Sequence, residues 1–203
     1  RHVGVLYSRD LDPHGRNVLY GFADSSHSVP RSQGCEVVMM NGGALSCDSK
    51  KHTVTGTSTC HDELISFTKC GNKTMGFRNL MKEAGMCAQK PSVVAQDNEA
   101  TIQILMNRGS LSSRTNHIDL NVLSSRNKIE DQEIVPEYVE TSLMRADFGT
   151  KALGADLFCK HRDAVNGYGL VKRHLPSFPL PSSSFLGPPP PSSALLRSQV
   201  PPE

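Results

Sequence analysis

The sequence predicts an α/β fold in which a mixed five-stranded sheet carries helices on both faces. Two observations support this fold class. Three strand-like segments come first in succession, with an Asn-Gly-Gly turn between the second and third, and helical and strand-like segments alternate after them. A hairpin meander followed by crossover connections gives a sheet that contains both antiparallel and parallel neighbours, with helices packed on its faces.

The first three strands are expected to be antiparallel. Within residues 17–28, apolar residues occur at every second position up to Asp24, which is the pattern of a half-buried strand. Residues 34–47 contain two short apolar runs on either side of Asn41 and Gly42. Asn-Gly between such runs is the strongest short-range signal for a hairpin. Asp24 should therefore lie near the end of the first strand.

A long helix is expected over residues 58–85. Its apolar residues recur at spacings of three, four and seven, which places them on one face: Phe67, Cys70, Phe77, Met81 and Ala84. Ser58 or Thr59 can cap the N-terminus, and Gly85 suits the C-terminus. Glu63 falls in the first turns of this helix.

The segment VVAQDNEATIQIL, residues 93–105, has the pattern of a short buried strand that leads straight into a helix. Asp97 stands just past the end of the strand, where the desolvation of its carboxylate has to be offset. Two explanations are open from the residues alone. Asp97 or Asn98 caps the helix, or Asp97 belongs to a group of carboxylates that binds a metal ion.

The remaining elements complete the alternation. A polar helix is expected over 118–131. A fifth strand follows over 133–141, and Pro136 restricts it to the edge of the sheet because proline cannot donate a ladder hydrogen bond. Two short helices are expected over 142–153 and 155–165.

Composition divides the chain into a connector at 1–16, a folded domain at 17–170 and a tail at 171–203. Residues 175–203 hold nine of the 13 prolines and seven serines. Such a stretch lacks the apolar side chains that would offset its ordering entropy, so a disordered tail is expected. A ligand for proline-binding domains is the less favoured alternative.

Charge and cysteine content exclude several classes of function. The net charge of +2 and pI near 8.3 permit a nucleic-acid partner without arguing for one. The sequence contains no run of about 18 apolar residues, so no membrane span is expected. The six cysteines show no Cys-x-x-Cys pair and no zinc-ligand spacing, so we expect free buried thiols.

Six short segments over roughly residues 18–170 carry a further pattern. The segments are YGFADSSHS, GGALSCDSKKH, STCHDELISF, AQDNEATI, RTNHIDL and IEDQEIVPEYVETSLMRADFGTKAL. In this order and near this spacing, they resemble motifs of the ribonuclease H domain at the C-terminal end of copia-type retrotransposon Pol polyproteins. Those motifs include G-Y-S-D-A-D-W-A, S-S-T-E-A-E-Y-I-A-L, C-D-N-x-x-A-I and A-D-x-L-T-K-P-L. Each match is weak alone, and six in order are strong.

The resemblance implies a ribonuclease-H-like fold and places the four catalytic carboxylates of that family on Asp24, Glu63, Asp97 and Asp147. These residues would bind Mg²⁺ or Mn²⁺, with two ions expected. Two divalent ions about 3.5–4 Å apart can activate a water and stabilise the attacking and leaving oxygens of a phosphodiester, and carboxylate oxygens suit such hard cations. Asp97 is then a metal ligand first and a cap second.

Each carboxylate also has an ordinary explanation when it is taken separately. Asp24 can be a strand-end turn residue, Glu63 a favourable charge near a helix N-terminus, and Asp147 part of a solvated helix face. His117 is an accessory candidate for which a structural role is favoured. We expect His27, just beyond Asp24, to be solvated.

The implied function is a metal-dependent endonuclease that hydrolyses the RNA strand of RNA–DNA hybrids. Its expected partners are the hybrid and an upstream reverse transcriptase domain of the same polyprotein, in the cytoplasm, within virus-like particles, or in the nucleus. The alternative is a catalytically inactive, degenerate domain that serves as a structural or nucleic-acid-binding module. Cys47 and Gly76 favour this alternative, because the family has tryptophans there and losing a buried tryptophan costs several kcal/mol.

Overall fold

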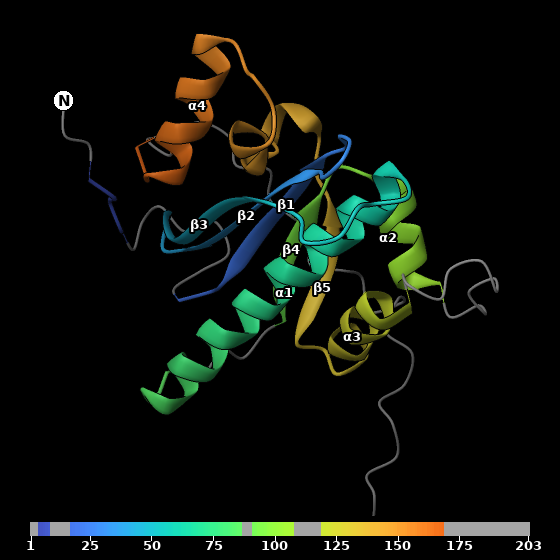
Figure 1. The fold of residues 1–203 in the computed structure, drawn as a ribbon. Coiled ribbons are helices and arrows are strands. Elements are labelled where there is room, and N and C mark those ends of the chain that lie inside the picture. Colours follow the sequence, from blue (N-terminus) through green and yellow to red (C-terminus); the bar gives the residue numbers. More distant parts are fainter. Residues whose placement is uncertain (1–3, 9–16, 87–90, 108–118, 169–203) are drawn as a thin grey trace, which may run out of the picture.

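The computed structural model describes residues 4–8, 17–86, 91–107 and 119–168. Its centre is a five-stranded sheet with the strand order β3-β2-β1-β4-β5 (Figure 1). The strands are β1 Tyr20–Ser26, β2 Gln33–Met40, β3 Gly43–Lys51, β4 Ser92–Gln96 and β5 Ile134–Tyr138. The first three pair antiparallel, whereas β4 runs parallel to both β1 and β5. The predicted mixed five-stranded sheet is confirmed.

The turn between β2 and β3 matches its sequence signal. Asn41 and Gly42 have φ angles of 51° and 84°, which is the left-handed region that Asn and Gly tolerate best. At the opposite side of the sheet, β5 forms the edge, as Pro136 predicts. The first signal thus predicts the β2–β3 turn, and the second predicts one edge of the sheet.

The helical elements cover both faces of the sheet (Figure 1). The α-helices are α1 Thr59–Glu83, α2 Glu99–Met106, α3 Asp119–Glu130 and α4 Ala155–Val165, and two 3₁₀ segments are η2 Thr141–Leu143 and η3 Arg145–Gly149. Among the described residues, no helix has both the length and the apolar character needed to span a membrane.

Side chains alternate between the two faces of the sheet, so the buried hydrophobic residues form two separate clusters. Ala23 and Val38 belong to a cluster that also contains Leu64 and Phe67 of α1. Their neighbours Phe22, Val37 and Met39 belong to a second cluster, which contains Met144, Ala146 and Val165 from the η segments and α4. Because successive strand residues point to opposite faces, Asp24 lies on the same face as Phe22 and thus faces the η segments.

One predicted helix has a different form. Residues 142–153 were expected to be a short α-helix, but η2 and η3 are 3₁₀ turns. The segment packs tightly on the sheet at Gly149, where an added Cβ would clash with Cys35 Sγ. Ser49 on β3 also donates a hydrogen bond to the Gly149 carbonyl. These tertiary contacts outweigh the local preference for a regular helix.

Three smaller expectations need correction. In α1, Phe67, Cys70 and Met81 are buried as expected, but Ala84 is exposed because it lies beyond the end of the helix. Cys47 and Gly76 are also exposed, so the absence of tryptophan there leaves no buried cavity. The argument for an eroded core is therefore wrong at both positions.

The cysteines are free thiols among the described residues, but they are not all buried. Cys35 and Cys70 are buried, Cys47 is exposed, and Cys60 and Cys159 are half-buried. Cys87, His117 and the predicted tail at 171–203 lie outside the described residues. The division into 1–16, 17–170 and 171–203 remains a prediction.

Candidate active site

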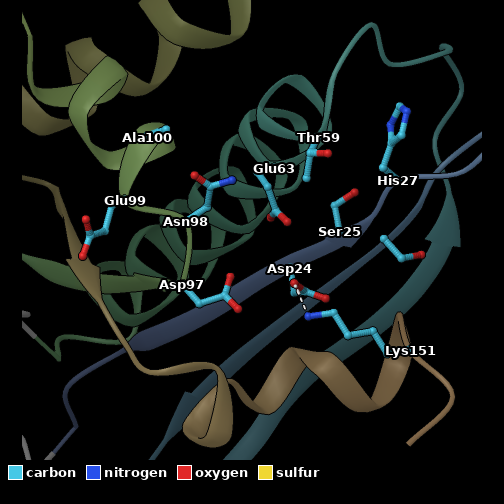
Figure 2. Close-up of a pocket in the computed structure, with 11 residues that line it drawn as sticks. Asp24, Ser25, His27, Thr59, Glu63, Asp97, Asn98, Glu99, Ala100 and Lys151 are labelled. Carbon is cyan, nitrogen blue, oxygen red and sulfur yellow. Dashed lines mark hydrogen bonds and ion pairs between the residues drawn. The ribbon is translucent and has the colours of Figure 1, made fainter.

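Three carboxylates converge where strands β1 and β4 end. These strands are parallel, so their carboxyl ends lie at the same edge of the sheet. Asp24 lies near the end of β1, and Asp97 directly follows β4. Glu63, in the early turns of α1, approaches the same edge from above the sheet (Figure 2). One carboxylate oxygen from each of the three residues lies within 4.8 Å of the other two.

The cluster is largely shielded from water. Asp24 is 1% exposed and Glu63 is 4% exposed, whereas Asp97 is half-buried. The described hydrogen bonds of Glu63 and Asp97 come from neutral donors. Gln96 Nε2 donates to Glu63 Oε2 at 2.9 Å, and Thr141 Oγ1 donates to Asp97 Oδ2 at 2.9 Å. These bonds orient the carboxylates without neutralising their charge.

Asp147 joins the site through a lysine. It lies on η3, which packs against β1, and it is 2% exposed. Lys151 Nζ lies 2.8 Å from Asp147 Oδ1 and 3.2 Å from Asp24 Oδ1. Thr150 Oγ1 donates to the other oxygen of Asp24. The structure thus brings all four predicted carboxylates to one edge of the sheet, but Asp147 is not a member of the group of three.

Burial and neighbouring charges shift the pKa values of Glu63, Asp147 and Lys151. Burial, followed by the charge of Asp24, raises the pKa of Glu63 to about 8. Burial also raises the pKa of Asp147 to about 6, although the hydrogen bond from Lys151 opposes this shift. Burial alone would lower the pKa of Lys151, but its contacts with Asp147 and Asp24 outweigh that effect and raise it.

The three clustered residues fit a divalent metal ion. All of their ligand atoms are carboxylate oxygens, which are the donors that Mg²⁺ and Mn²⁺ prefer. A cation at this position would also offset the repulsion that raises the pKa of Glu63. Asp24, Glu63 and Asp97 could therefore hold such an ion.

The structure shows that Asn98, and not Asp97, caps helix α2. Asn98 is the N-cap of α2, and its side-chain oxygen accepts a hydrogen bond from the Thr101 amide at 3.2 Å. Asp97 instead points toward Asp24 and Glu63 (Figure 2). The capping explanation for Asp97 is therefore wrong, and the metal-binding explanation stays open.

The cluster lies at the bottom of an open cleft of about 580 Å³. Lys151, His27 and the first turn of α2 also line this cleft (Figure 2). A polymer strand that crosses the cleft would bring its backbone next to the three carboxylates. This arrangement can present a bound cation to an extended substrate.

His27 is not simply solvated, as the sequence suggested. Its Nδ1 lies 2.6 Å from Oδ2 of Asp62, which is fully buried and also accepts a hydrogen bond from Ser32 Oγ at 2.6 Å. No local sequence signal predicts this pair, because its members are 35 residues apart. Lys151 was also missed, although its spacing of four from Asp147 is a recognisable pattern for an ion pair.

Comparison with solved structures identifies the fold as ribonuclease H-like. The N-terminal ribonuclease H domain of a Mycobacterium tuberculosis protein, solved as a fusion with maltose-binding protein, superposes with a TM-score of 0.50. It is 10% identical, and the match covers 73% of this chain and 98% of that chain. Ribonuclease H1 of Halobacterium salinarum gives a TM-score of 0.48 at 10% identity, with 65% and 91% of the two chains covered. At such low identity the likeness to the Mycobacterium domain concerns the fold alone.

Sequence comparison confirms the resemblance to a retrotransposon polyprotein. The retrovirus-related Pol polyprotein from transposon TNT 1-94 of Nicotiana tabacum is 30% identical over 122 residues. The match covers 59% of this chain and 9% of that protein, so the chain spans less than a tenth of the length of this relative. No family model matches the chain.

Proposed function

We propose that the chain is the ribonuclease H domain of a copia-type retrotransposon Pol polyprotein, which hydrolyses the RNA strand of RNA–DNA hybrids with a divalent metal ion. One observation carries the proposal: Asp24, Glu63 and Asp97 come from three separate elements and converge to within 4.8 Å at the bottom of a cleft. Asp24 and Glu63 are almost completely buried, and the described ion pairs give a cation only to Asp24, so burying a charged Glu63 is costly.

The residues of the site would have different roles. Asp24, Glu63 and Asp97 would hold the ion, which when bound supplies an activated water and positive charge beside the phosphodiester. Gln96 and Thr141 keep Glu63 and Asp97 in place through their hydrogen bonds. Lys151 offers a further positive charge at the same end of the cleft.

Two findings support the choice of substrate. The chain shares the ribonuclease H fold, and its sequence is similar to part of a retrovirus-related Pol polyprotein. An RNA–DNA hybrid is recognised mainly through its backbone, with the 2′-hydroxyls marking the RNA strand. The upstream reverse transcriptase domain of such a polyprotein would be the partner that supplies the hybrid.

The proposal is tested with purified protein and a hybrid labelled on its RNA strand. Cleavage is measured with Mg²⁺, with Mn²⁺ and with EDTA, and duplex DNA of the same sequence is the matched substrate control. We expect cleavage of the RNA strand only with metal and only in the hybrid. Equal cleavage of both duplexes would indicate a different nuclease with this fold.

The same assay separates the enzyme from the inactive alternative. A structural or binding module would retain the hybrid in a filter-binding or anisotropy measurement but leave the RNA strand intact with both metals. Binding without cleavage would therefore overturn the catalytic part of the proposal and leave the nucleic-acid partner in place.

A further inference from the structure

Lys151 places its positive charge between two buried carboxylates of the site. Its ammonium group contacts Asp24 and Asp147 at 3.2 Å and 2.8 Å, and both of these carboxylates are almost completely buried. Figure 2 shows the side chain reaching into the cleft toward Asp24. The lysine side chain is 36% exposed, so it approaches the buried pair from the open side.

The four carboxylates thus form two halves that share Asp24. In one half, Glu63 and Asp97 accept hydrogen bonds from neutral side chains, and no ion pair to either is seen among the described residues. In the other half, Asp147 and Asp24 already share the positive charge of Lys151. Only the first half still lacks a cation.

Formal charge distinguishes one metal ion from two. With all four carboxylates ionised, they and one ammonium carry a charge of −3, which one divalent ion reduces to −1 and a second ion reverses to +1. A second ion beside Asp24 and Asp147 would also meet the ammonium of Lys151 at contact distance. Like charges that close repel strongly in a partly buried site.

We propose that Lys151 takes the place of a second metal ion, so that the centre binds one divalent ion at Asp24, Glu63 and Asp97 while Asp147 serves as the partner of the lysine. This inference rests on the proposed function, because it assumes that the cluster of three binds metal. It changes the expected count from two ions to one and assigns Lys151 a positioning role beside Asp24.

The count of bound ions tests this directly, without any substrate. Mn²⁺ is titrated into the full chain, and free Mn²⁺ is followed by its electron paramagnetic resonance signal. The parent should bind one ion per chain. Lys151→Gln, which vacates the second position, should bind two. Lys151→Arg keeps the charge and should bind one.

Lys160→Gln is the matched control. Lys160 is exposed on α4, where its ammonium contacts only the carbonyl of Ser142 among its described hydrogen bonds. The substitution changes the net charge by the same amount without touching the cluster, so one bound ion is expected. Far-ultraviolet circular dichroism checks that each variant is folded.

The outcomes separate this inference from the proposed function. Two ions on the parent would overturn the inference, whether or not Lys151→Gln folds, and would leave the metal-dependent nuclease intact. A single ion on Lys151→Gln, even if bound more tightly, would also overturn it, because the second position would then not exist. If the parent binds no Mn²⁺ at all, the metal centre of the proposed function fails together with the inference.

Discussion

Glu63 is almost completely buried, and the nearest charges that act on it are those of two other carboxylates, Asp24 and Asp97. A buried acid in such surroundings keeps its proton unless a cation arrives. The raised pKa belongs to the metal-free protein, and a metal ion that binds here would have to displace the proton. This coupling makes stability, pH and metal content depend on one another.

The first prediction concerns the pH dependence of metal-free stability. An unfolded glutamate loses its proton near pH 4.5, whereas Glu63 keeps it in the folded chain until about pH 8. The stability contributed by Glu63 is complete below pH 4.5 and is lost as the pH rises to about 8. In EDTA, we expect the melting temperature of the parent to fall over this range relative to that of Glu63→Gln.

The comparison with Glu63→Gln is needed because other groups titrate in the same range. Burial lowers the pKa of His52 and of His161, so their contribution to stability increases as the pH rises through about 6.5. Since both proteins contain these histidines, the difference between the two melting curves isolates Glu63. A difference that stays constant from pH 5 to pH 8 would contradict the account.

The second prediction concerns the charge of Asp97. Asp97→Asn keeps the shape of the side chain and its ability to accept from Thr141, but removes one of the crowded negative charges. The metal-free variant should melt at an equal or higher temperature than the metal-free parent, because repulsion within the cluster is relieved. Several millimolar Mg²⁺ should raise the melting temperature of the parent and have much less effect on the variant.

Glu99→Gln is the control for this measurement. Glu99 is exposed and points away from Asp24 and Glu63 (Figure 2). Its variant should respond to Mg²⁺ as the parent does. If Mg²⁺ stabilised Asp97→Asn as much as the parent, Asp97 would not be a ligand.

At the scale of elements, the short helix α2 begins immediately beside the site. Its N-cap is Asn98, one residue after Asp97. Asn98 therefore caps the helix, which leaves Asp97 free for the proposed role in metal binding. The third prediction follows from this division. Asn98→Ala should lower the free energy of unfolding by about 1 kcal/mol, because the Thr101 amide loses its acceptor. Denaturant unfolding measures the change.

Asn98→Ser is the matched variant, since serine caps a helix about as well as asparagine. It should be close to the parent in stability. Both variants should keep the stabilisation by Mg²⁺ that Asp97→Asn loses. An unchanged free energy of unfolding in Asn98→Ala would show that the cap lies elsewhere.

The elements also show which features local sequence can predict. The β2–β3 hairpin follows from Asn41 and Gly42, because only a few residue types accept positive φ angles. The 3₁₀ form of η3 could not be predicted, because it depends on the contact between Gly149 and Cys35, which are distant in sequence. Local signals predict turns and caps, while packing between distant segments decides the form of a short helix.

At the scale of the whole molecule, the sequence predicted where the candidate site lies better than it predicted the ion pairs around that site. Parallel neighbours β1 and β4 bring Asp24 and Asp97 together once the strand order is known. The ion pairs of Lys151 with Asp24 and of His27 with Asp62 could not be predicted, because each depends on the relative position of segments that are far apart in sequence.

The fourth prediction concerns the extent of the folded unit. Residues 17–170 are expected to form one domain, with the Pro/Ser-rich stretch after it as a separate tail. Limited trypsin digestion should cut first at Lys172 or Arg173 and leave a resistant fragment that mass spectrometry can identify. Protection of the chain through Arg197 would show that the tail belongs to the folded unit.

The central claim is that three converging carboxylates hold the metal ion with which this chain cuts RNA. The most direct test is the rate of RNA-strand cleavage in a labelled RNA–DNA hybrid, with saturating Mg²⁺, for the parent, Asp97→Asn and Asp156→Asn. Asp156 is an exposed residue of α4 that does not line the cleft. We expect the parent and Asp156→Asn to cleave at similar rates, whereas Asp97→Asn should be slower by orders of magnitude, because the ion loses a ligand that positions it. Equal cleavage by the parent and Asp97→Asn would contradict the account.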